Sequence, residues 1–187
     1  DTARWTEWLF KDQGIPTKTW PVHEFTYLST WGTRNSTVEE RRPAVLKYWE
    51  LSNPSVPDGP GAESFEQFID RVKRVKMDLD TIKGTVAVFS HNQFICALLW
   101  LSEQSSLEIN ARAMRYFRKF LDEHPIPNGA IVEVRFEDGG GRWQHKILTA
   151  HLNPLESNRT SGAASFAPLE IPPSPSIATA GLSRAAN

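Results

Sequence analysis

The chain has 187 residues, 21 basic and 22 acidic side chains, a formal net charge of −1 and a single cysteine. This length suits one domain with a sizeable core, or one domain and a tail. Because it has no basic run and no block of like charges, the sequence argues against nucleic acid and against a membrane surface as partners. One cysteine excludes an intrachain disulfide, and without Cys/His spacing typical of zinc ligands we expect no metal and no cofactor.

Two short elements are predicted at the start of the chain. Residues 2–12 favour a helix with Trp5, Trp8 and Leu9 on one side. Residues 17–22 are a candidate for a short strand.

A polar, irregular stretch covers residues 26–42. Within it, Thr37 and Glu40 have the spacing of a capping box. Pro43 argues against one unbroken helix through to Glu50, because a proline removes a helix hydrogen bond.

The middle of the chain carries the clearest helix, over residues 64–79. Ser64 and Gln67 fit a capping box at its start. Residues 85–90 then form a continuous apolar run, which is typical of a strand buried on both faces. The apolar residues of the helix form one stripe: Phe65, Phe68, Ile69, Val72, Val75 and Leu79.

Four further elements are predicted downstream. Residues 93–101 favour a buried helix and residues 111–121 a second helix with its apolar side inward. Residues 130–136 and 142–148 alternate in polarity around an Asp-Gly-Gly-Gly sequence, which indicates a β-hairpin. The inward residues of the second helix are Met114, Phe117, Phe120 and Leu121.

The composition changes at about Leu155, after which Ser, Ala and Pro dominate. We therefore expect a domain over residues 1–154 and a disordered tail over residues 155–187. Helices interleaved with buried strands predict an α/β fold, specifically a three-layer α/β/α domain with a mostly parallel sheet. The absence of a signal-peptide pattern and of an apolar stretch long enough to span a bilayer favours a cytoplasmic protein.

Ser90-His91-Asn92 joins the predicted strand to the following helix. A helix start presents unpaired N–H groups and a partial positive charge, so a histidine there can help to bind a phosphate. The alternative is a junction whose histidine only packs or caps the helix. Cys96 lies among apolar residues, which favours a buried, inert thiol over a nucleophile.

Three segments together resemble the histidine phosphatase superfamily, also called the phosphoglycerate mutase-like family. Residues 86–101 are similar to the motif around its second histidine, and residues 58–65 to its Gly-Glu-Ser-Phe helix start. Residues 21–25, Pro-Val-His-Glu-Phe, are similar to the segment with its acidic proton donor. The similarity covers about residues 1–152, with the motifs in the family's order.

The resemblance implies a metal-independent phosphomonoester hydrolase that transfers a phosphoryl group through a phosphohistidine. His91 would be the second histidine and Glu24 the proton donor. Asn92, Arg41 and Arg42 would bind the substrate, a small phosphorylated metabolite, although the two arginines are equally explained as solvated charges.

The Arg-His-Gly motif with the nucleophilic histidine is absent from the chain. We therefore expect an N-terminally truncated domain whose nucleophile would lie upstream of Asp1. In this state the chain would be inactive and self-associate through an uncovered strand edge. The alternative function is an inactive phosphate- or protein-binding remnant of the fold.

Overall fold

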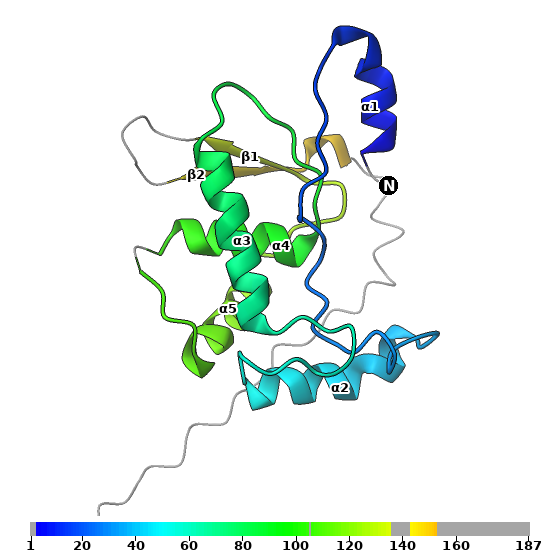
Figure 1. Cartoon of the computed structure of the whole chain (residues 1–187), viewed down its shortest axis with the longest axis vertical. Helices are drawn as coiled ribbons and strands as arrows, with labels where there is room; N and C mark the ends of the chain where they lie inside the picture. The colour runs from blue at the N-terminus through cyan, green and yellow to red at the C-terminus, as the bar shows by residue number, and fades with distance from the viewer. Residues whose placement is uncertain (1–2, 105, 136–142, 153–187) are drawn as a thin grey trace, which may run out of the picture. The chain divides into compact units, whose positions relative to one another are not determined.

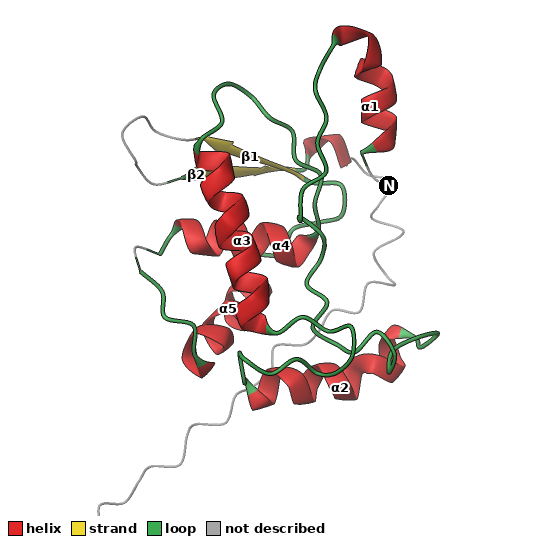
Figure 2. Cartoon of the chain, in the orientation of Figure 1, coloured by secondary structure: helices red, strands yellow, loops and turns green. Residues whose placement is uncertain are grey.

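The structure is a computed structural model that describes residues 3–104, 106–135 and 143–152. These residues form five α-helices, two short 3-10 helices and two β-strands (Figure 1, Figure 2). The predicted tail and the Asp-Gly-Gly-Gly turn of the hairpin lie outside the described residues. Within those residues, no helix is both long enough and apolar enough to cross a membrane.

The predicted N-terminal helix is present as α1 (Arg4–Phe10), which continues into the 3-10 helix η1 (Lys11–Gln13). It ends at Gly14, whose φ of 65° is the left-handed conformation that glycine adopts without strain. None of the residues of either helix is buried, and Trp5 is 78% exposed. The apolar side of this helix therefore has no extensive packing partner among the described residues.

The prediction that Pro43 prevents one unbroken helix through to Glu50 is wrong. α2 (Val38–Leu51) runs unbroken through Pro43 and begins with the predicted capping box of Thr37 and Glu40. Pro43 lies in the second turn, so only one early backbone hydrogen bond is lost. The cap and the burial of Tyr48 and Trp49 in the second half of the helix offset that loss.

Three helices build the core and agree with the sequence. They are α3 (Phe65–Asp80), α4 (Asn92–Ser102) and α5 (Ala111–Glu123), and α4 contacts both of the others (Figure 1). The predicted capping box of α3 forms, and the predicted apolar stripes of α3 and α5 are buried.

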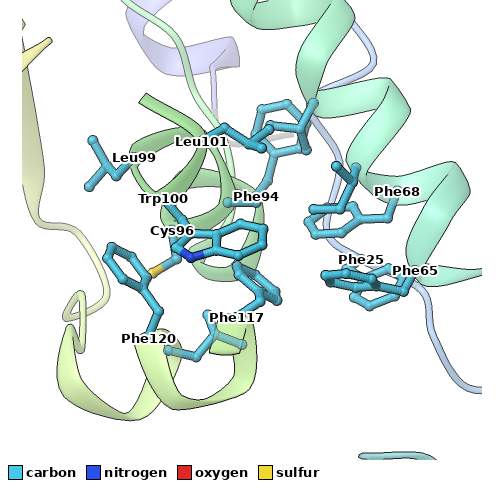
Figure 3. Packing of buried hydrophobic residues seen from close by; sticks show 14 of the residues in the cluster. Phe25, Phe65, Phe68, Phe94, Cys96, Leu99, Trp100, Leu101, Phe117 and Phe120 are labelled. Atoms are coloured by element: carbon cyan, nitrogen blue, oxygen red, sulfur yellow. The ribbon is translucent and has the colours of Figure 1, made fainter. Parts of the chain in front are cut away.

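Aromatic rings fill the space between these helices (Figure 3). Phe25 stacks on Phe68 with ring centroids 4.2 Å apart. Phe117 lies within 6.0 Å of Phe68 and within 5.3 Å of Trp100, measured between ring centroids. Because large rings bury large apolar areas, this cluster contributes strongly to the hydrophobic stabilisation of the region.

The predicted hairpin is present. β1 (Ile131–Arg135) pairs antiparallel with β2 (Gln144–Leu148), with Ile131 opposite Leu148. The residue before β2, Trp143, donates through Nε1 to Asp80 Oδ1 at 2.9 Å and so connects the hairpin to the end of α3. The 3-10 helix η2 (Ala150–Leu152) follows β2.

The structure does not confirm a three-layer domain with a mostly parallel sheet, because among the described residues β1 and β2 form the only sheet. Residues 17–22 and 85–90 are not paired as strands. The prediction that residues 85–90 are buried on both faces is wrong in this structure, since residues 85–89 are all exposed. No described strand lies beside them to pair with their backbone or cover their side chains.

Candidate functional site

His91 is the residue that immediately precedes α4. It has an extended backbone conformation, and its side chain makes no capping hydrogen bond to the helix. The side chain is exposed and therefore open to a ligand. The predicted helix start is confirmed, whereas the predicted strand before it is absent.

Glu24 reaches the same place from a distant part of the chain. Its Oε1 accepts hydrogen bonds from the backbone N–H of Gln93 at 3.1 Å and from that of Phe25 at 3.0 Å. Gln93 lies in the first turn of α4, two residues after His91. The Glu24 carboxylate therefore lies at the positive end of the α4 dipole and satisfies one of its free N–H groups. The two predicted catalytic residues are thus brought to the start of one helix.

Arg71 of α3 holds the segment that leads to Glu24. It is only 5% exposed, and its guanidinium makes a two-pronged ion pair with Glu63, with N···O distances of 2.8 and 2.7 Å. Its Nη1 also donates to the carbonyl oxygens of Pro21 at 2.8 Å and His23 at 2.9 Å. The buried charge is thereby paired and hydrogen-bonded, as a buried charge must be.

Ser90 holds the opposite edge of the same segment. Its hydroxyl donates to the carbonyl oxygen of Val22 at 2.6 Å. Neither Arg71 nor this role of Ser90 was predicted from the sequence. One signal was available for Arg71, since it lies on the buried side of α3 beside Phe68 and Val72, where a charge requires a partner.

Asn92 is exposed and begins α4, next to His91. Its side-chain oxygen lies 3.4 Å from Cys96 Sγ, so the thiol donates back toward it. Burial raises the pKa of the Cys96 thiol to about 12, and the nearby Glu24 carboxylate acts in the same direction. The thiol therefore stays protonated at neutral pH, in agreement with the prediction of an inert cysteine.

Arg41 and Arg42 belong to α2 rather than to an irregular loop. Arg42 is exposed and Arg41 is half-buried. The pKa of Tyr27 is raised mainly by burial, and the charge of Arg41 is one of several that act on it. Among the described residues, no hydrogen bond or ion pair joins either arginine to the start of α4, so their binding role stays a prediction.

A separate cavity of about 420 Å³ lies beside Arg71. Neither His91 nor Glu24 lines it. Within the described ranges no group of three His, Cys, Asp or Glu side chains could hold a metal ion. The cavity is lined by His23, Thr26, Gly61, Ala62, Glu63, Gln67, Arg71 and Arg74.

Comparison with protein families assigns the chain to one family. The family model of the histidine phosphatase superfamily (branch 1) matches residues 6–148. The chain therefore belongs to the histidine phosphatase superfamily, an α/β family of phosphatase- and mutase-type phosphoryl-transfer proteins. Neither the comparison with curated proteins nor that with solved structures gave a match.

Proposed function

We propose that this chain provides the second-histidine and proton-donor part of a metal-independent phosphomonoester hydrolase. The observation that supports it is the contact between the Glu24 carboxylate and the Gln93 N–H, which brings Glu24 to the helix start that His91 precedes. A proton donor and a phosphate-binding histidine must act on the same phosphoester, so they must converge.

In the proposed reaction a histidine nitrogen attacks phosphorus while the bond between phosphorus and the leaving oxygen breaks. Glu24 gives its proton to that oxygen, and His91 donates a hydrogen bond to a phosphoryl oxygen as negative charge accumulates there. Water then attacks the phosphorus of the phosphohistidine and gives its proton to the Glu24 carboxylate. The bond between phosphorus and the histidine nitrogen breaks, and inorganic phosphate leaves, which restores the enzyme. The substrate is a small phosphorylated metabolite, and Asn92, Arg41 and Arg42 contribute to its binding.

The proposed reaction requires a nucleophilic histidine, and we propose that it lies upstream of Asp1, because residues 1–187 contain no Arg-His-Gly sequence. In the complete fold, residues 85–90 would be a strand of a mostly parallel, three-layer sheet. Their exposed, unpaired state supports the proposal that a partner strand is needed there.

A second function is supported by the same observation. A chain without the nucleophile and with an uncovered apolar segment also suits an inactive phosphate- or protein-binding remnant of the fold. The two functions differ in whether any form of the protein turns over a phosphomonoester.

The test compares residues 1–187 with the same chain extended by its natural upstream sequence, using p-nitrophenyl phosphate. We expect no turnover from residues 1–187 and turnover from the extended chain. In the extended chain, His91→Ala should lower kcat by about 10²–10³-fold and Glu24→Gln by about 10²–10⁴-fold.

His145→Ala is the matched control, because His145 is exposed on β2 and should leave kcat unchanged. Activity from residues 1–187 alone would remove the need for an upstream nucleophile. An inactive extended chain that still binds inorganic phosphate would favour the remnant.

A further inference from the structure

We propose that Arg71 is a positioning residue for Glu24, and that it holds the Glu24 carboxylate at the start of α4 without touching the substrate. The inference rests on the proposed function, because that function makes Glu24 the proton donor. The structural evidence is a series of contacts that runs from α3, through the segment before Glu24, to the first turn of α4.

The first step is the direction of the backbone carbonyls. In an extended segment successive carbonyls point to opposite edges, so those of residues i and i+2 share an edge. Arg71 Nη1 binds the carbonyls of Pro21 and His23 on one edge, and the Ser90 hydroxyl binds that of Val22 on the other. Three consecutive carbonyls are therefore held by side chains, where a sheet would hold them by neighbouring strands.

The second step is the peptide plane between His23 and Glu24. The carbonyl oxygen of His23 and the N and Cα atoms of Glu24 belong to one rigid peptide unit. By binding that oxygen at 2.9 Å, Arg71 fixes the orientation in which the backbone enters Glu24. The position of the Glu24 carboxylate then depends on the φ angle and the rotamer of Glu24 alone, and the observed combination reaches the Gln93 N–H.

The third step concerns the shape of the guanidinium, which explains why position 71 needs an arginine. The guanidinium has five N–H donors in one plane, which lets it bind both oxygens of Glu63 and two carbonyls at once. A lysine ammonium keeps the charge but lacks the planar fork. Arg71→Lys should therefore keep an ion pair with Glu63 and loosen the contacts to the Pro21 and His23 carbonyls.

The test measures hydrogen–deuterium exchange at the Gln93 amide by mass spectrometry with electron-transfer fragmentation. Glu24→Ala defines the exchange rate without the carboxylate. We expect Arg71→Lys to speed exchange at Gln93 by about two- to tenfold, the range that loss of one net hydrogen bond allows. The control variant is Arg74→Lys, on the same helix but exposed, which should leave this rate unchanged.

A control amide separates positioning from general loosening. The Ala113 N–H lies in the first turn of α5 and donates to the Asn110 side chain at 3.0 Å, so it is a capped helix-start amide that none of the contacts of Arg71 involves. Faster exchange at Gln93 with an unchanged rate at Ala113 supports the proposal. An unchanged rate at Gln93, or an equal increase at both amides, overturns it.

If Arg71→Lys fails to fold, Glu63→Gln replaces it, since it removes one anchor of the guanidinium and keeps the residue's shape. Failure of both variants to fold would show that the Arg71–Glu63 pair only stabilises the fold, and it would also overturn the proposal.

The exchange measurement needs no substrate, so it is independent of the activity assay. An inactive extended chain with accelerated Gln93 exchange refutes the proposed function alone. Unchanged exchange in an active enzyme refutes the positioning role alone.

Discussion

The helical region around α3, α4 and α5 and the segment of residues 85–89 both contain large apolar side chains, but the surroundings of these side chains are opposite. In the helical region Phe68 and Phe117 are fully buried, and each contacts several other rings (Figure 3). In the segment, Val86 is 46% and Val88 41% exposed. A helix satisfies its own backbone and needs only one covered side, whereas a strand needs a neighbour for its backbone as well. Local sequence can therefore complete the first region but not the second.

The largest expected effect is on the helical region. Phe68→Ala removes a fully buried ring that stacks on Phe25 and should lower the free energy of unfolding by about 3–5 kcal/mol. Phe89→Ala, in the exposed segment, should change it by less than about 0.5 kcal/mol. Urea unfolding of both variants measures the contrast, and similar losses would show that the two regions are equally packed.

The next effect is a pH dependence that comes from the same core. Because burial raises the pKa of Cys96 from 9.0 to about 12, the unfolded chain loses this proton at lower pH than the folded chain does. The protonated Cys96 thiol therefore contributes fully to the free energy of unfolding below about pH 9. This contribution is lost as the pH rises, and the loss is about 1.4 kcal/mol at pH 10.

Urea unfolding of the wild type and Cys96→Ala at pH 8 and pH 10 tests this prediction. The variant should lose less stability between the two pH values. The pKa values of Tyr27 and Tyr48 are also raised by burial, and their contributions fall mainly above pH 10. An equal loss in both proteins would show that Cys96 does not cause the dependence.

A substitution in the exposed segment should have a smaller effect on stability, but it should change self-association measurably. We expect residues 1–187 to self-associate, because an uncovered apolar segment can pair with a second copy. Val88→Lys should shift the elution toward the monomer in size-exclusion chromatography and change the free energy of unfolding by less than about 0.5 kcal/mol.

The matched control is Gln104→Lys, which adds the same charge at an exposed position outside the segment. It should leave the elution volume as in the wild type. A monomeric wild type would contradict the expected association.

The smallest effect is expected from the sequence after the domain. Large apolar residues are sparse in residues 158–187, so their deletion should leave the melting temperature within about two degrees. Differential scanning calorimetry measures this difference. A fall of several degrees would show that these residues bury apolar surface on the domain.

Sequence alone determined the elements whose signals are local. The capping boxes at Thr37 and Ser64, the apolar stripe of α3 and the alternation of the hairpin each depend on residues a few positions apart, and each is present in the structure. The same spacing rules marked His91 as the start of a helix. They also favoured a break at Pro43, where the tertiary burial of the later turns prevailed over one missing hydrogen bond.

Only the tertiary structure decided which distant residues meet at that helix start. The contacts that hold Pro21, Val22, His23 and Glu24 join residues 48, 50, 68 and 69 positions apart. No periodicity encodes such a pairing, because it depends on how the packed helices bring α3 and the start of α4 to opposite edges of one extended segment. The exposure of residues 85–89 was decided in the same way, since an apolar run specifies a strand but cannot specify whether a neighbouring strand is there to cover it.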